Sequence, residues 1–245
     1  IDIREEYLKK SIEFASDEVS NLKAKIFFLK KVFNPIFIYE SVNKGSVDTF
    51  FTNTKPEWLE KLNDNIWKST KDIITNHTSG SMDSYRYALL EVTALLLKLA
   101  SKYLGDLRKD IIKFSWNYIK LEDNITKQVA YVTTSYFISV YETPAKLTTQ
   151  VFVALLRTHQ TDSRYLVKQA LDILAPVMSE RMNDADSSDN WLKWPRRILS
   201  EDGFNVTQVL NVYQFIVQHP DLFFVAREHF VSNIITAMGK LTILA

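Results

Sequence analysis

The regular spacing of helical segments is the feature of this sequence that most constrains its fold. Apolar residues recur at i, i+3, i+4 and i+7, the pattern of one buried helix face, in segments that begin near Ser84, Asn124, Ser163 and Asn205. These starts lie about 40 residues apart, the period of helical hairpin repeats of the HEAT or armadillo kind. A single hairpin cannot bury its apolar face, so consecutive hairpins must stack. The sequence therefore predicts an all-α fold, an α-solenoid of HEAT-like helical hairpin repeats.

Two regions of the chain differ in how clearly they show this repeat. Residues 84–245 are interpreted as about four HEAT-like hairpins in one continuous solenoid fragment. Residues 1–83 are interpreted as degenerate helical repeats with loops. Helices are expected there at about 3–15, 17–33 and 57–76, with a break at Asn34-Pro35. Polar, Ser, Thr and Gly residues indicate loops at 44–55, 75–84 and 183–190.

Local signals place the helix boundaries of the second region. Residues 129–141 are rich in β-branched and aromatic residues, so a strand is the alternative to a helix there. A cap at Asn124, and Thr143-Pro144 as the N-cap and first residue of the next helix, favour the helix. Pro176 is expected to end or kink the helix that begins at Ser163. A last helix is expected over about 222–241.

Composition excludes several classes of protein. Five Gly and six Pro in 245 residues are too few for the tight turns of sandwiches, barrels and propellers. Lys and Arg number 30 against 29 Asp and Glu, a net charge of +1, so no overall field would hold nucleic acid or anionic lipid. The absence of Cys excludes disulfides, thiolate metal sites and cysteine nucleophiles. We therefore expect no membrane and no sequence-specific nucleic acid as a partner.

The sequence contains no motif for catalysis or for a cofactor. Its glycines stand too far apart for a dinucleotide fingerprint, a phosphate-binding loop or a nucleophile elbow. Its histidines include no HExxH pair. The acidic run of Asp184, Asp186 and Asp189 departs from a calcium loop where that loop needs a glycine and a glutamate. We expect no catalytic residue, no cofactor and no metal, and therefore no enzyme.

One tripeptide points to a different class. His219-Pro220-Asp221 is the mark of J-type co-chaperones, and it lies between two expected helices. J-domains present a basic helix to their partner, whereas the helix that precedes this tripeptide has no basic residue. The reading that we favour is a helix stop in which Asp221 caps the next helix.

Two surface features could bind a partner. The basic and aromatic run from Trp191 to Arg197 could meet acidic segments through arginine, which makes Lys193, Arg196 and Arg197 the candidate partner-binding residues. The alternative is that Trp191 and Trp194 belong to the core and the cations are simply solvated. The second feature is an uncharged amide edge, which is either a packing face for another subunit or an ordinary wet face. Its residues are Asn205, Gln208, Asn211, Gln214 and Gln218.

Four longer segments, together with Trp191, Trp194 and Arg196, carry a resemblance to a known family. They closely resemble the TRRAP family, giant pseudokinase scaffolds related to phosphatidylinositol 3-kinase-like kinases, and the chain looks like a fragment of a fungal member. The resemblance covers about residues 85–240, and residues 1–84 match loosely. The segments are RKDIIKFSWNYIKLED at 108–123, KQVAYVTTSYFISVYETPAK at 127–146, TQVFVALLRTHQ at 149–160 and LVKQALDILAPVMSERM at 166–182.

The resemblance implies a non-catalytic, nuclear scaffold segment of a transcription coactivator subunit that belongs to the SAGA and NuA4 histone acetyltransferase complexes. The implied partners are acidic activation domains of transcription activators and other subunits of these complexes. The family's kinase-like domain has no counterpart in this sequence, so neither catalysis nor nucleotide binding is carried over. The alternatives are another HEAT-repeat adaptor, such as a transport receptor or a phosphatase scaffold, and a J-type co-chaperone.

Overall fold

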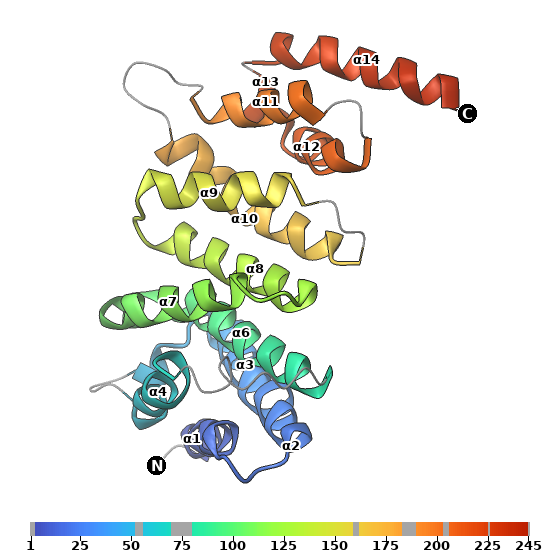
Figure 1. The fold of residues 1–245 in the computed structure, drawn as a ribbon. Helices are drawn as coiled ribbons and strands as arrows, with labels where there is room; N and C mark the ends of the chain where they lie inside the picture. Colours follow the sequence, from blue (N-terminus) through green and yellow to red (C-terminus); the bar gives the residue numbers. More distant parts are fainter. Residues whose placement is uncertain are drawn as a thin grey trace. The chain divides into compact units, whose positions relative to one another are not determined.

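A computed structural model describes residues 3–51, 56–69, 80–158, 162–182, 190–202, 206–224 and 226–244. Within these ranges the regular structure is entirely helical and contains no strand (Figure 1). The expected all-α class is therefore confirmed. The chain divides into two compact units, residues 1–140 and 141–245. The sequence-based division after residue 83 stays a prediction.

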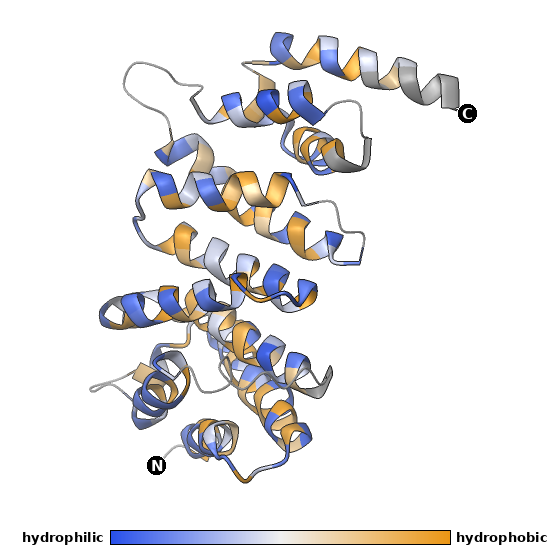
Figure 2. Cartoon of the chain, viewed as in Figure 1, coloured by the Kyte–Doolittle hydropathy of each residue, from blue (hydrophilic) through white to orange (hydrophobic). Residues whose placement is uncertain are grey.

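The first unit is built from α-helices joined by 3₁₀ and π-helical turns. Most of these helices contribute buried apolar residues to the core, and Figure 2 shows hydrophobic and hydrophilic residues alternating along them. The helices described in this unit are α1 (Ile3–Ser16), α2 (Leu22–Phe27), α3 (Asn34–Lys44), α4 (Glu57–Leu62), α6 (Gly80–Ala100), α7 (Arg108–Ile119) and α8 (Asn124–Val140). Short 3₁₀ turns lie at Asp48–Phe51, Ser101–Tyr103 and Gly105–Leu107.

The predicted break at Asn34-Pro35 is wrong, because the helical path runs through it. A π-helical turn over Phe28–Phe33 joins α2 to α3, and Asn34 N–H donates to the Leu29 carbonyl, five residues back. Proline cannot donate the next ladder hydrogen bond. The wider turn shifts the hydrogen-bond pattern just before Pro35, where one bond must be lost in any case. A second π turn, Asn63–Trp67, extends α4 in the same way.

The ambiguous segment 129–141 is a helix, as predicted, and α8 packs against both α6 and α7. The buried hydroxyls of Thr133 and Thr134 find partners inside the unit. Thr133 Oγ1 donates to the Leu90 carbonyl at 3.2 Å, and Thr134 Oγ1 donates to Ser115 Oγ at 3.2 Å. The cap lies one residue earlier than predicted, because Asp123 Oδ2 rather than Asn124 accepts the Thr126 N–H at 2.7 Å.

Aromatic rings fill the core of the first unit. Phe37 lies 5.2 Å from Phe33 and 5.5 Å from Trp58 between ring centroids, and Phe51 lies 5.7 Å from Trp58. All four side chains are buried. Because Phe51 comes from the 3₁₀ turn after α3, the expected loop at 44–55 contributes to the core in its described part, which ends at residue 51.

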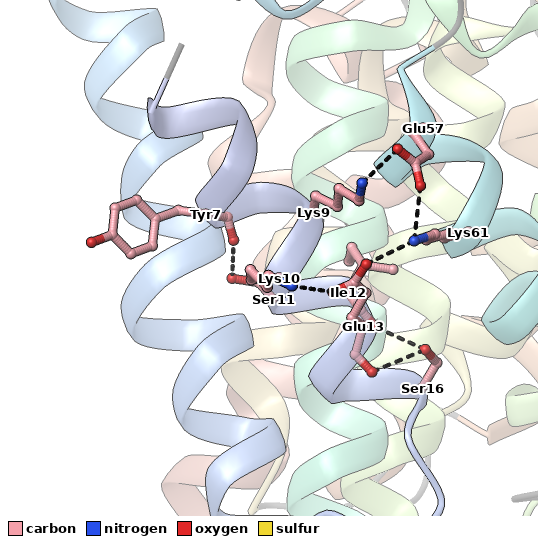
Figure 3. A network of polar contacts seen from close by, with 9 residues as sticks. All are labelled: Tyr7, Lys9, Lys10, Ser11, Ile12, Glu13, Ser16, Glu57 and Lys61. Carbon is pink, nitrogen blue, oxygen red and sulfur yellow. Dashed lines mark hydrogen bonds and ion pairs between the residues drawn. The ribbon is translucent and has the colours of Figure 1, made fainter. Parts of the chain in front are cut away.

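A chain of ion pairs joins α1 to α4 on the surface of the first unit (Figure 3). Lys9 Nζ lies 2.7 Å from Glu57 Oε2, and Lys61 Nζ bridges Glu57 Oε1 at 2.9 Å and Glu13 Oε1 at 2.7 Å. The hydrogen bonds from Lys9 and Lys61 lower the pKa of the Glu57 carboxyl to about 2. Opposite charges alternate along this network, so it neutralises itself.

The second unit contains α9 (Ala145–Leu156), α10 (Arg164–Arg181), α11 (Lys193–Asp202), α12 (Val206–Gln218), α13 (Pro220–Phe224) and α14 (Glu228–Leu244) in its described residues. Two boundaries differ from the predictions. Pro144, rather than Thr143, holds the N-cap position of α9, and the Thr143 hydroxyl bonds that of Thr148 at 3.0 Å. The predicted last helix is two helices, α13 and α14.

Of the two outcomes expected at Pro176, an end of the helix is wrong, since α10 continues to Arg181, and a kink stays a prediction. Pro176 lies on the exposed side of α10, whereas its neighbours Ala175 and Val177 are buried. We infer that packing of the buried side holds the helix together across the missing N–H. The loops expected at 75–84 and 183–190 lie mostly outside the described residues, and Gly80–Ser84 belongs to α6.

One continuous run of aromatic contacts forms the core of the second unit. Phe215 of α12 meets Phe152 of α9 and Phe223 of α13 with ring centroids 5.6 Å and 5.5 Å apart. Phe223 also meets Trp191 at 5.4 Å and Phe230 of α14 at 5.3 Å. All five side chains are at most 3% exposed. Edge-to-face geometry of this kind adds to the stabilisation from burial, so these rings hold four helices and the turn before α11 together.

Replacement of Phe215 by Ala removes the centre of this run. Phe215→Ala is expected to lower the free energy of unfolding by about 3–5 kcal/mol, measured by urea unfolding followed by circular dichroism. Phe224→Ala is the matched control, because Phe224 is 63% exposed and its ring lies outside the buried run, 4.1 Å from the Arg227 guanidinium; it should cost less than about 1 kcal/mol. Equal losses in the two variants would contradict this account of the core.

The ion pairs of Glu57 predict a specific acid sensitivity. A carboxyl whose pKa is lower in the folded than in the unfolded state stabilises the fold above the unfolded pKa, and this stabilisation is lost as pH falls through the folded pKa. The window for Glu57 therefore runs from 4.5 down to about 2. Glu57→Gln should reduce the fall in melting temperature across the upper part of this window. Glu60→Gln, on the same helix but outside the network, should leave the fall unchanged.

Candidate partner-binding surface

The candidate residues Lys193, Arg196 and Arg197 all lie on α11, whose orientation is set by the core. Trp191, in the 3₁₀ turn Asn190–Leu192 just before α11, is 3% exposed and packs among the aromatic rings of the core. Three further side chains on the inner side of the helix are buried, and α11 packs against α9, α12 and α14. These three buried residues are Pro195, Ile198 and Leu199.

The outer side of α11 is basic. Lys193, Arg196 and Arg197 are all exposed. Residues three and four apart share one face of a helix, so Lys193 lies in line with both arginines and Arg197 lies in line with Glu201. The structure therefore brings the three predicted residues together on one face. Among the described residues, the Arg196 guanidinium makes no ion pair.

Glu201 ties this face to the end of α9. Arg197 Nε donates to Glu201 Oε1 at 2.6 Å, and Arg157 Nη2 donates to Glu201 Oε2 at 2.6 Å. The hydrogen bond from Arg197 lowers the pKa of the Glu201 carboxyl, burial opposes this, and the hydrogen bond from Arg157 adds to the lowering. Two arginines, one at the end of α9 and one on α11, thus hold one carboxylate. We call Arg157, Lys193, Arg196, Arg197 and Glu201 the basic face.

Arg157 and Glu201 were absent from the sequence-based candidates. The spacing of Arg197 and Glu201, four residues apart on a helix, is a signal that could have identified Glu201. No local signal points to Arg157, which lies 44 residues from Glu201 along the chain. Their contact depends on how α9 and α11 pack, which periodicity alone does not specify.

The two tryptophans have different environments. Trp191 belongs to the core, as the alternative reading expected. Trp194 is half-buried, and the Lys193 ammonium lies 5.5 Å from its ring centroid. One tryptophan thus positions the helix, and the other lies at the edge of the basic face.

The predicted amide edge does not form one surface. Asn211 is buried, and its side-chain amide donates to the carbonyls of Leu155, at 3.3 Å, and Thr158. Its amide thus adds a hydrogen bond to the Leu155 carbonyl, which also accepts the Thr158 N–H at 3.2 Å. Gln214 is half-buried and Gln218 is exposed, whereas the side chains of Asn205 and Gln208 lie outside the description.

The tripeptide His219-Pro220-Asp221 lies at a helix junction. His219 separates α12 from α13, and its ring nitrogen Nε2 lies 2.9 Å from Asp172 Oδ1 of α10. Pro220 is the first residue of α13, and Asp221 lies in its first turn rather than at the cap. The contact with α10 gives His219 a role within the unit.

The described part of the chain offers few features of other kinds of site. No group of three or more His, Asp or Glu residues could hold a metal ion there. No helix in those ranges is long and apolar enough to cross a membrane. A shallow groove of about 300 Å³ lies between α1 and α3, with mostly apolar walls. Its lining residues are Arg4, Tyr7, Lys31, Val32, Pro35, Ile36 and Tyr39.

Comparisons with known proteins extend the resemblance to the whole chain. The model of the Tra1 HEAT repeat ring region matches residues 1–245. The chain is 46% identical, over 91% of its length, to the SAGA complex/NuA4 acetyltransferase complex subunit TRA1 of Saccharomyces cerevisiae. It is 37% identical over 89% to the Schizosaccharomyces pombe subunit Tra1, and 29% identical over 90% to the human transformation/transcription domain-associated protein. The chain spans 6% of the length of each of these relatives.

Charge reversal of the basic face should leave the fold intact. Lys193, Arg196 and Arg197 are exposed, and the buried side of α11 does not depend on them. The triple variant K193E/R196E/R197E is therefore expected to keep its far-ultraviolet circular dichroism and to lose about 4 °C or less in melting temperature. A collapsed helical signal would mean that these side chains hold the fold.

Proposed function

Because the chain belongs to the Tra1 HEAT repeat ring family, we propose that it is a non-catalytic scaffold segment of a transcription coactivator subunit. Its relatives in the two yeasts carry the names of SAGA and NuA4 acetyltransferase complex subunits. The helices of this chain would present surface to other subunits of such a complex and to transcription activators. The proposed place of action is the nucleus. Neither an enzyme nor a cofactor-dependent step is part of this proposal.

The basic face is the observation that carries the proposal at the level of residues. Arginine and lysine side chains that are exposed on one rigid helix can bind carboxylates of a partner without the cost of ordering a loop. Trp194 at the edge supplies an aromatic surface beside the charges. We propose that Lys193, Arg196 and Arg197 contact the acidic activation domains of transcription activators.

The mechanism is recruitment by binding free energy. Acidic segments with few apolar residues are disordered when free, so each contact is weak after the cost of ordering. Several such contacts along a scaffold would raise the effective affinity through linkage. A partner held in this way would be brought close to whatever activity the complex carries.

The other two readings have less support. A transport receptor or a phosphatase scaffold would share the helical repeats, but the matching relatives are named as SAGA/NuA4 acetyltransferase complex subunits or with reference to transcription. A J-type co-chaperone would need its tripeptide free to act on a partner, whereas His219 contacts Asp172. We therefore keep the coactivator scaffold as the single proposal.

The proposal predicts which partners are lost when the basic face is reversed. The full-length protein carrying K193E/R196E/R197E should retain the acetyltransferase complex subunits on affinity purification. Its recovery of an acidic activation domain should fall severalfold. Nuclear imaging of the tagged protein tests the proposed place of action in the same cells.

A matched control distinguishes an effect of the basic face from an effect of the net charge of the protein. Lys109, Lys113 and Lys120 are exposed on or just after α7, and K109E/K113E/K120E changes the charge by the same amount. The assignment of the basic face would be withdrawn if both triple variants recovered equal amounts of activator. If no acetyltransferase subunit accompanied even the unaltered protein, the scaffold proposal would fail as well.

A further inference from the structure

The geometry points to Glu201 as an internal counter-ion that occupies the carboxylate-binding position of the basic face until a carboxylate of a bound partner replaces it. This inference rests on the proposed function and adds to it a regulatory residue, Glu201, and a further binding residue, Arg157. The occupant to which we commit is a peptide segment rich in Asp and Glu.

The first step of the argument is stereochemical. Arg157 and Arg197 come from different helices, yet both direct N–H groups at the two oxygens of one carboxylate, each at 2.6 Å. Arginine N–H groups match the geometry of a carboxylate. The position now held by Glu201 is therefore already shaped for a carboxylate from any source.

The second step concerns exposure. The side chains of Glu201, Arg157 and Arg197 are 40%, 46% and 62% exposed. Ion pairs that remain this accessible to water contribute little to stability and exchange partners readily. Replacement of Glu201 by another carboxylate exchanges one ion pair for a similar one, so the fold does not oppose it.

The third step is the surplus of positive charge. The basic face holds four cations and one carboxylate, and Arg196 has no ion-pair partner among the described residues. Arg196 can attract an acidic segment while Glu201 still holds the other two arginines. Displacement of Glu201 would then complete the contact, because a carboxylate of the partner would take its place beside Arg157 and Arg197.

A consequence is that Glu201 limits the affinity of this surface. A ligand must compete with a carboxylate that is tethered beside the arginines and therefore always present at high effective concentration. Removal of the Glu201 charge should strengthen the binding of acidic peptides, which is the opposite of what a purely structural ion pair predicts. Removal of the Arg157 charge should weaken it.

The experiment measures fluorescence anisotropy of a labelled, unstructured peptide of Glu, Asp, Leu and Ser residues, titrated with the protein at low and at physiological salt. Glu201→Gln is expected to tighten binding about two- to fivefold, the range that an exposed ion pair spans. Arg157→Gln should weaken binding by a similar factor. Both effects should shrink as salt rises.

Asp202→Asn is the matched control. It removes one negative charge from the neighbouring residue of the same helix, and the Asp202 carboxylate forms no ion pair among the described residues. If Asp202→Asn tightened binding as much as Glu201→Gln, the effect would be net charge and the inference would be overturned. Weaker binding by Glu201→Gln would also overturn it, since Glu201 would then be holding the arginines in place for the partner.

The outcomes separate this inference from the function on which it rests. Binding that is lost in K193E/R196E/R197E but equal in the Glu201 and Asp202 variants would keep the basic face as a partner site and reject the role of Glu201. No binding by the unaltered protein would reject both. Tighter binding to duplex DNA than to the peptide would also reject both, because the surface would then recognise phosphate backbones.

Discussion

The need to cover one apolar side of every helix governs the rest of this structure. In the second unit that need is met by aromatic rings contributed by four helices and the turn before α11. Trp191 is fixed in this run immediately before α11, and burial continues inside the helix at Ile198 and Leu199. Only the opposite side of α11 is left for its cations. The chemistry of the surface is therefore a consequence of how the core is packed.

Charge is used in two different ways in this nearly neutral chain. Between α1 and α4, Lys9, Glu13, Glu57 and Lys61 alternate in sign and satisfy one another. On the basic face, cations outnumber the single carboxylate, and Arg196 forms no ion pair within the described ranges. A net charge of +1 excludes a field of the whole molecule that would attract charged partners. It says nothing about how charges are distributed locally on the surface.

Helical periodicity predicted the fold class and the helical state of residues 129–141, because both depend on local spacing. The errors have local causes too. A break was expected at Asn34-Pro35 and an end or a kink at Pro176, yet a π turn and the packing of α10 carry the helical path through both. The pairing of Arg157 with Glu201 could not be predicted, since it depends on the contact between α9 and α11. Such contacts arise from side-chain packing in three dimensions, about which a one-dimensional pattern carries no information.

The π turn over Phe28–Phe33 also bears on how the length of this chain can vary. An i→i+5 turn contains one more residue than the corresponding α-helical turn. Loss of one residue there would restore regular α-helical spacing and leave α2 and α3 at nearly the same rotation, because the residue lost is the extra one of the wide turn. The stacked rings of Phe33 and Phe37, which lie against Trp58, would keep their place on the α3 side of such a deletion. The turn is thus a position where the chain can shorten by one residue without turning the apolar side of either helix away from the core.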